Sequence, residues 1–203
     1  MHKRRIGALL VAVVTALLVA PAANAQASLV EVAPCDDARL SKPFAPWLDV
    51  ANYKLAPGGD FERGFGGWTL SRGAAPALGS EPWGVTGKVG TRALALPAGA
   101  TALSPATCVN AGSPTVRFFA RSTGGLLPLL RVDAVYRDGL ASVAVPVGVV
   151  LPTSRWQPSA PMLTGSVATA ALAGGEVPMS LRFTAVRGTW QVDDVFVDPY
   201  SRR

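Results

Sequence analysis

Short runs of alternating apolar and polar residues, separated by glycine and proline, fill most of the chain after residue 57. The run 129–137 is the clearest example, because its even-numbered residues are apolar or aromatic while two arginines and an aspartate stand at odd-numbered positions. A period of two residues is that of a β-strand with one buried face. Roughly eight to ten such runs, without a convincing amphipathic helix, predict an all-β fold, an antiparallel β-sandwich of the jelly-roll type.

The predicted strands are Trp68–Ser71, Arg92–Leu96, Ala102–Ser104, Thr107–Val109, Thr115–Arg121, Leu129–Arg137, Ala141–Val150, Pro178–Val186 and Trp190–Asp198. Asp138-Gly139 is a typical tight-turn pair, so we expect the runs on either side of it to form a hairpin.

The first 25 residues have the pattern of a secretory signal peptide. Residues 2–5 are basic, about fifteen apolar residues follow, and Ala23-Asn24-Ala25 fits the small-x-small cleavage motif. The apolar run is shorter than the roughly 20 residues that a membrane-spanning helix needs. We therefore expect residues 1–25 to be removed and the protein to be secreted or associated with the cell envelope, with no transmembrane segment after cleavage. An uncleaved membrane anchor is the alternative.

The remaining chain of about 178 residues suits one β-sandwich domain. The whole chain has a net charge of +6, and three of its cations lie in the signal segment. The only histidine is His2, so the mature chain would lack a His general base, a Ser-His-Asp triad and any His-ligated metal. No Lys/Arg block accompanies the positive charge, which argues against nucleic acid as a partner. P-loop, Cys-x-x-Cys, Gly-x-Ser-x-Gly and dinucleotide-binding motifs are also absent from the sequence, so we expect no enzyme activity.

Two cysteines remain after cleavage, Cys35 and Cys108. An even number in an exported protein predicts a disulfide, because such compartments are oxidising. The bond would stabilise the fold by roughly 4 kcal/mol in the chain-entropy description. It would tie residues 26–56, an irregular strap with prolines and large apolar residues, to the sandwich domain at residues 57–199. Two buried free thiols are the alternative.

The last predicted strand has a pattern that a regular strand cannot accommodate. Trp190 and Val192 share one parity, whereas Val195 and Val197 share the other. All four can face the core only if the register slips by one residue at Asp193-Asp194, which predicts a β-bulge there.

Two further acids, Asp60 and Glu62, lie in a Gly-rich segment at residues 58–68. If this segment is an opening strand beside the closing strand, its carboxylates lie near Asp194. Ca²⁺ binds carboxylate and backbone oxygens in flexible geometry, so a structural calcium site is one hypothesis. The alternative is that these acids cap turns, pair with Arg63 or Arg187, or face water.

The patterns Gly-Asp-Phe-Glu-x-Gly…Gly-Trp at residues 59–68 and Trp-x-Val-Asp-Asp-Val-x-Val at residues 190–197 resemble the first and last strands of carbohydrate-binding modules with the galactose-binding-like jelly-roll fold, as in uncharacterised secreted bacterial proteins. The resemblance covers about residues 57–199, with its signature at the two ends. It implies a structural calcium held by Asp60, Glu62 and Asp194. The chain departs from the family pattern at Gly59, where Asn is common, and in its N-terminal strap.

Sugar rings stack on exposed aromatic side chains while polar groups bind their hydroxyls. Trp68 and Trp190 stand within strand patterns, so we expect them in the core. Trp83 and Trp156 stand in loop-like sequence and are the candidate platforms for a glycan. Alternatively, these two rings close the end of the sandwich.

Arg117, Arg131 and Arg182 lie on the polar faces of predicted strands. If the strands are neighbours in one sheet, the arginines form a face suited to carboxylate or sulfate groups, which guanidinium binds in a planar, bidentate manner. An ordinary solvated face is the alternative.

These features together favour a secreted, non-catalytic carbohydrate-binding-like module that recognises a glycan or another envelope component. The main alternative is an extracellular or envelope domain that binds another protein and has no sugar site. A hydrolase with an unusual carboxylate pair is a third hypothesis.

Overall fold

The computed structural model describes residues 39–109, 114–138, 141–164 and 177–199. Its elements are η1 (Ala45–Trp47), β1 (Lys54–Leu55), β2 (Thr69–Ser71), β3 (Ala75–Leu78), β4 (Arg92–Leu96), β5 (Thr101–Leu103), β6 (Thr107–Val109), β7 (Thr115–Asp138), β8 (Ala141–Val150), β9 (Gln157–Pro158), β10 (Met162–Leu163) and β11 (Val177–Asp198). All strand pairs are antiparallel, which confirms the predicted antiparallel β-sandwich. Among the described residues we find no helix with the length and apolar character of a membrane span. The signal segment and Cys35 lie outside the described residues, so both predictions there stay open.

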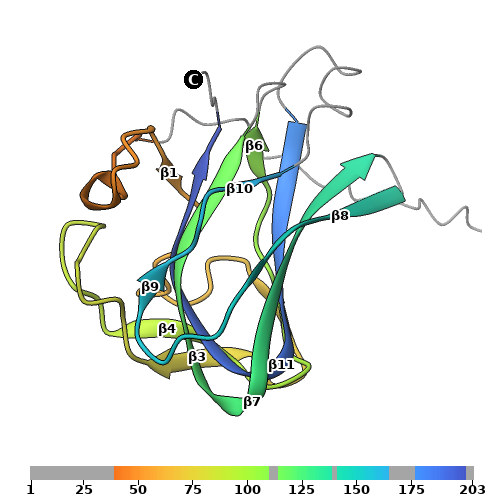
Figure 1. Ribbon diagram of the computed structural model, residues 1–203. Helices are drawn as coiled ribbons and strands as arrows, with labels where there is room; N and C mark the ends of the chain where they lie inside the picture. Colours follow the sequence, from red (N-terminus) through yellow and green to blue (C-terminus); the bar gives the residue numbers. More distant parts are fainter. Residues whose placement is uncertain (1–38, 110–113, 139–140, 165–176, 200–203) are drawn as a thin grey trace, which may run out of the picture. The chain divides into compact units, whose positions relative to one another are not determined.

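Two long strands organise the fold. β7 and β11 pair with each other from Met179 opposite Tyr136 to Asp198 opposite Thr115, and both bend midway (Figure 1). The sequence predicted four separate strands here, at residues 115–121, 129–137, 178–186 and 190–198, and that division is wrong. The glycines that look like strand ends in the sequence lie at the bend of a continuous ladder.

The bend depends on glycines that let the two strands approach each other. A Cβ on Gly125 would lie 2.5 Å from the Cα of Gly188, and Gly125 itself has a φ of +99°. A Cβ on Gly188 would lie 2.7 Å from both the Gly124 carbonyl oxygen and a Pro128 carbon. Only glycine fits at this crossing, because it has no Cβ and adopts positive φ at no steric cost.

The bend divides the strands into two packed layers. The first layer combines residues 129–138 of β7 and 177–185 of β11 with β2, β5, β6 and β8, and the second combines residues 115–124 of β7 and 187–198 of β11 with β1, β3, β4, β9 and β10. Their inner faces form the main core, where Phe118 of one layer meets Phe183 of the other at a centroid distance of 5.0 Å. Trp68 and Trp190 belong to this core, as predicted. The predicted hairpin is confirmed by the pairing of β7 with β8.

A second apolar cluster lies on the outer face of the second layer. Phe119 and Phe196 point away from the main core and pack with Phe44 and Tyr53 from the N-terminal segment. Phe44 lies 5.5 Å from Phe119 and 5.6 Å from Phe196, measured between ring centroids. Residues 41–55, a part of the strap predicted at residues 26–56, therefore form an ordered cover over one face of the sandwich, and we use the name strap for this part from here on.

The closing strand contains the predicted bulge. Between Asp193 and Phe196 the ladder advances three residues on β11 but only two on β7, and Asp194 has a φ of +45°. The slip lets Val192 and Val195 both enter the core, and it confirms the prediction made from their parity.

The segment before Trp68 lies beside the closing strand but is not a strand. Residues 57–67 form successive turns, because several of their glycines, among them Gly58, Gly64 and Gly67, adopt positive φ. The backbone N–H of Val195 donates to the Gly59 carbonyl oxygen at 3.0 Å. A Cβ on Gly59 would lie 2.9 Å from the Val195 carbonyl oxygen, which explains why this position is glycine. The predicted opening strand is therefore corrected to a turn segment that contacts the bulge.

Candidate functional site

An aromatic groove lies on the outer face of the second layer. It has a volume of about 560 Å³ and is lined by Trp47, Trp83, Arg117, Arg155, Trp156, Gln157, Pro158, Ser159 and Ala160. Four parts of the chain build it: the strap, the loop between β3 and β4, Arg117 of β7, and the segment around β9. The structure thus brings together three of the five predicted ligand-binding residues, namely Trp83, Trp156 and Arg117.

Trp83 has the geometry of a supported platform. Its ring lies 5.4 Å from the Phe119 ring at an interplanar angle of 33°, and Trp47 meets it edge-on at 5.1 Å. The residue is nevertheless 47% exposed. A tryptophan that packs on one side and is exposed on the other offers a flat apolar surface on which a sugar ring can stack.

Trp156 is a second, half-buried ring in the groove. The Arg121 guanidinium lies over it at 5.0 Å from the ring centroid, a cation–π arrangement, and the Arg121 Nε donates to the Gln191 side chain at 2.8 Å. These contacts hold the indole in place beside Gln157, whose exposed side chain can bind hydroxyl groups.

Arg117 is a buried structural cation at the floor of the groove. Its Nη1 lies 2.8 Å from the Asp49 carboxylate of the strap, and its Nε donates to the Ser159 carbonyl oxygen at 2.9 Å. Its guanidinium also lies 4.2 Å from the Phe44 ring centroid. Arg117 therefore ties the strap to the wall of the groove.

The Asp49 carboxylate is the centre of this attachment. It accepts hydrogen bonds from the Tyr53 hydroxyl at 2.8 Å and from the backbone N–H of Ala51 at 3.2 Å. Burial raises the pKa of Asp49, but the hydrogen bonds from Tyr53, Arg117 and Ala51 outweigh that effect and hold the pKa below its ordinary value. Burial, together with the nearby carboxylate, raises the pKa of Tyr53 to about 12.

The loop that carries Trp83 is held by Glu81. This side chain is fully buried and accepts hydrogen bonds from the backbone N–H groups of Trp83 and Val85. The backbone N–H of Glu81 in turn donates to the Asp193 carboxylate at 2.9 Å. The position of Trp83 thus depends on an acid at the bulge of the closing strand.

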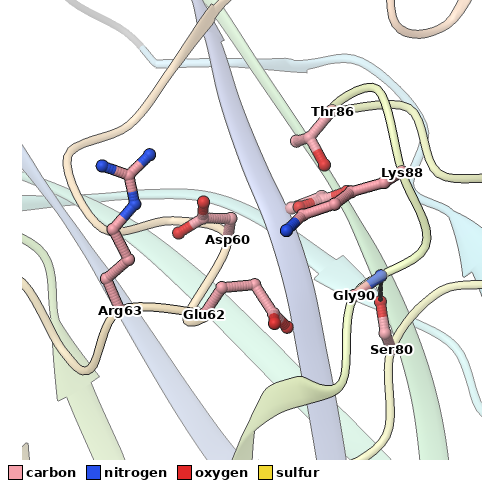
Figure 2. A pocket seen from close by; sticks show the side chains of 8 residues that line it. Asp60, Glu62, Arg63, Ser80, Thr86, Lys88 and Gly90 are labelled. Carbon is pink, nitrogen blue, oxygen red and sulfur yellow. Dashed lines mark hydrogen bonds between the residues drawn. The ribbon is translucent and has the colours of Figure 1, made fainter.

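A second, more polar pocket is lined in part by residues of the same loop (Figure 2). It has a volume of about 270 Å³ and is lined by Asp60, Glu62, Arg63, Ser80, Thr86, Lys88, Gly90 and Asp194. All three predicted metal ligands, Asp60, Glu62 and Asp194, therefore line one pocket. Figure 2 shows Lys88 reaching from its loop toward the same space.

Glu62 already has partners within the protein. Its carboxylate accepts hydrogen bonds from the backbone N–H groups of Thr91 and Arg92, at 2.6 and 2.7 Å, and from the Thr91 hydroxyl at 3.0 Å. Burial raises the pKa of Glu62, but these bonds and the charge of Lys88 together outweigh that effect and bring the pKa below its ordinary value. Glu62 therefore closes the far end of the Trp83 loop.

Three buried acids lie next to one another at this pocket, and one of them, Asp194, is part of its lining. Glu81, Asp193 and Asp194 are each at most 3% exposed, and in the described part of the chain no Lys or Arg forms an ion pair with them. Burial raises the pKa of Asp193 to about 7. Burial and the charges of Asp193, Glu81 and Asp60 raise the pKa of Asp194 to about 9.

The carboxylate oxygens of this acidic cluster are suitable donors for a hard cation. Carboxylate oxygens are the ligands that Ca²⁺ prefers, and a bound cation would offset the repulsion between the buried acids. Across the described residues, however, no three His, Cys, Asp or Glu side chains are already arranged around a common point as a metal centre.

Arg131 and Arg182 do not belong to either pocket. They lie on the outer face of the first layer, where both contact the buried Asp133 carboxylate, at 3.3 and 3.1 Å. The predicted arginine face is therefore divided between the two layers, because Arg117 lies on the second.

Cys108 is buried on β6, and its predicted partner Cys35 lies outside the described residues.

Sequence reasoning missed Trp47, Glu81 and Arg155 as parts of the site. Glu81 stands two residues before Trp83 in Gly79-Ser80-Glu81-Pro82-Trp83, a spacing that suits a carboxylate capping its own loop. Arg155 directly precedes Trp156, so the sequence placed it beside a candidate platform. For Trp47 no signal in the sequence pointed to the groove.

Comparison with known proteins finds similarity to solved structures alone. No family model and no curated protein matches the chain. Among solved structures, the chain is similar to the CBM22-1–GH10 modules of a Clostridium thermocellum endo-1,4-beta-D-xylanase complexed with xylohexaose, at 16% identity and a TM-score of 0.49. The match covers 68% of this chain but only 27% of that one.

Two further similar structures are isolated modules. One is a family 29 carbohydrate-binding module mutant, with 11% identity, a TM-score of 0.45, and coverage of 74% of this chain and 87% of that one. The other is TmCBM61 in complex with beta-1,4-galactotriose, with 16% identity, a TM-score of 0.39, and coverage of 69% and 94%. These three structures are carbohydrate-binding modules or contain one, and similarity at this level carries no information about the ligand of this chain.

Proposed function

We propose that the protein is a non-catalytic carbohydrate-binding module, and that the aromatic groove is its glycan site. One observation carries the proposal: Trp47, Trp83 and Trp156, from three separate segments, line a single groove with polar groups beside them. The groove volume of about 560 Å³ falls in the range of ligand sites, which is roughly 300–1,000 Å³. Exposed tryptophan faces next to Gln and Arg side chains match the mixed apolar and polar surface of a sugar.

The proposed setting is outside the cytoplasm, where extended glycans are found. The expected signal peptide at residues 1–25 supports this setting, and so does the expected disulfide. The main alternative is that the same groove binds a peptide or protein of the envelope, since tryptophan and arginine are also frequent in protein interfaces. A specific response to saccharides distinguishes the two.

The direct test is retention of the secreted protein on a panel of polysaccharides and a glycan array. We expect binding to at least one glycan, and Trp83→Ala should weaken it about tenfold or more, because buried aromatic anchors dominate binding energy. Trp83→Tyr should keep a substantial part of the affinity. Leu78→Ala is the matched control, since Leu78 is an exposed apolar residue next to the loop but outside the groove.

Two outcomes would count against the proposal. Failure to bind any glycan, combined with capture of an envelope protein that Trp83→Ala abolishes, would establish the alternative. Release of reducing ends from a polysaccharide would show catalysis and contradict the non-catalytic part.

We also propose that a calcium ion binds in the polar pocket, with Asp60, Glu62 and Asp194 as the candidate carboxylates. The chemistry that the ion supplies is positive charge next to buried acids, and Glu81 and Asp193 would then hold the Trp83 loop without strong repulsion. Saturating Ca²⁺ should raise the melting temperature by about 5 °C or more, since ligand at 100 times its Kd adds about 2.7 kcal/mol. Asp194→Asn should remove this response. An unchanged melting temperature at saturating calcium would end the calcium proposal and leave the glycan proposal intact.

A further inference from the structure

The charged residues that line the aromatic groove are all positive. Two of its lining residues are arginines, Arg117 and Arg155, and none of the described residues that line it is Asp or Glu. A third arginine, Arg121, lies over the Trp156 ring. The Asp49 carboxylate balances Arg117 alone, so the groove carries more positive than negative charge.

Among the described arginines that line the groove, Arg155 is the one without a counter-charge. It is exposed, and among the described residues its guanidinium has no ion pair and no hydrogen bond. Its backbone is held, since the Arg155 N–H donates to the Thr153 hydroxyl at 3.3 Å and the same hydroxyl donates to the Arg155 carbonyl oxygen at 3.1 Å. A fixed backbone next to Trp156 keeps this side chain at the rim of the groove.

The arginines of the first layer are different. Arg131 and Arg182 lie 44% and 36% exposed by side chain, yet both point to the same carboxylate, that of Asp133. Carboxylates therefore neutralise these two arginines and Arg117 of the groove, but not Arg155. Other exposed arginines, such as Arg187, also lack an ion pair among the described residues, but Arg155 differs from them because it lines the groove.

We propose that the groove is selective for acidic saccharides: a sugar ring stacks on Trp83 while its carboxylate, or a sulfate ester, binds the Arg155 guanidinium. Guanidinium forms planar, bidentate hydrogen bonds with both groups. The positive field of Arg155 and Arg121 also favours association with an anionic polymer. This inference rests on the proposed function, because it names the class of glycan that the same groove takes.

The test uses ligand pairs that differ only in charge. Polygalacturonate, alginate and a glucuronoxylan are each compared with their methyl-esterified forms, and dextran sulfate is compared with dextran to distinguish sulfate from carboxylate. We expect at least one acidic form to bind about tenfold more tightly than its neutral partner, since hydrogen bonds to charged groups are the strong ones. The preference should decrease as salt is raised.

Variants assign the preference to one residue. Arg155→Gln should bring the affinity ratio between the acidic and the neutral form close to one, and Arg155→Lys should restore part of the preference for the acidic form. Arg187→Gln removes the same charge from an exposed position on β11 outside the groove, so it should change nothing.

The outcomes separate this inference from the proposed function. Equal binding of both members of every pair, or binding of neutral glycans only, with sensitivity to Trp83→Ala, overturns the inference and keeps the glycan site. An acidic preference that survives Arg155→Gln also overturns it. Absence of binding to every glycan overturns the proposed function as well.

Discussion

Glu62 holds the end of the loop that carries Trp83. Its carboxylate accepts hydrogen bonds from Thr91 and Arg92, and Ser80 accepts one from the Gly90 N–H at 3.1 Å close by. At the other end of the loop, Glu81 is held by Asp193. Acids of the turn segment and of the bulge therefore fix both ends of a loop that has no regular secondary structure of its own.

Glu62→Ala should destabilise the protein by about 1 kcal/mol, since it removes hydrogen bonds to a charged group in a partly exposed setting. Urea unfolding measures this, and glycan affinity should fall a few-fold because the loop end is released. Thr91→Val is the graded control, because it removes only the hydroxyl donor and should cost less. Unchanged stability in Glu62→Ala would show that these bonds do not hold the loop.

Individual residues were predictable where packing alone decided their place. The parity of Val192 and Val195 required the bulge at Asp193-Asp194, because both valines had to be buried. The burial of Trp68 and Trp190 in the main core was predictable in the same way, from their positions in strand patterns. Trp47 could not be predicted, because its place depends on an ion pair between Asp49 and Arg117 that joins positions 68 residues apart.

At the scale of elements, the bend shared by β7 and β11 decides how the sandwich closes. Gly125 and Gly188 face each other across it at a distance that no side chain permits. Each long strand therefore serves both layers, and the ladder between them continues on either side of the bend.

Gly125→Ala should cost about 3 kcal/mol or more, since it combines a positive φ with a Cβ 2.5 Å from the Gly188 Cα. Gly124→Ala, one residue earlier, is the matched control. Its Cβ would lie 3.3 Å from the Thr189 hydroxyl oxygen, and we expect stability within about 1 kcal/mol of the wild type. Thermal or urea unfolding compares the two, and equal costs would contradict this account of the bend.

The elements themselves were predictable from alternation and turn residues, as the hairpin of β7 and β8 shows. The continuity of β7 and β11 through the bend was not predictable, because a Gly-Gly pair predicts a strand end as readily as a bend within a ladder. The same ambiguity affected the segment 57–67, whose glycines form turns although its sequence resembles a strand.

At the scale of the whole molecule, the strap adds a side wall to the sandwich and makes the groove a joint product of distant segments. Its attachment combines the packing of Phe44 and Tyr53 with the buried ion pair of Asp49 and Arg117. Because the strap also supplies Trp47, strap attachment and glycan affinity should change together.

Asp49→Asn should destabilise the protein by roughly 3 kcal/mol at neutral pH, because it leaves Arg117 buried without its counter-charge. The folded pKa of Asp49 is lowered, so its stabilising effect is present above the unfolded value of about 4 and is lost as pH falls through the folded pKa. The stability difference between wild type and variant should therefore be constant from pH 5 to pH 7 and should shrink below about pH 4. A difference that stays the same down to pH 2 would contradict the role of the charge.

The fold brings some of the predicted site residues together and places others on separate layers. Trp83, Trp156 and Arg117 meet in one groove, and Asp60, Glu62 and Asp194 line one pocket. Arg131 and Arg182 lie on the other layer, because the shared bend places residues 129–138 of β7 and 177–185 of β11 there. The parity of a residue assigns its side chain to one face of its own strand, but it does not say in which layer that part of the strand lies.

The most direct test of the central claim is to map amide chemical shifts of the isotope-labelled protein during titration with the glycan that it retains best. We expect shifts concentrated at residues 45–49, 81–91 and 153–160, the segments that line the aromatic groove together with Arg117. Shifts concentrated instead around Arg131, Asp133 and Arg182, on the outer face of the first layer, would place the glycan elsewhere and contradict the account.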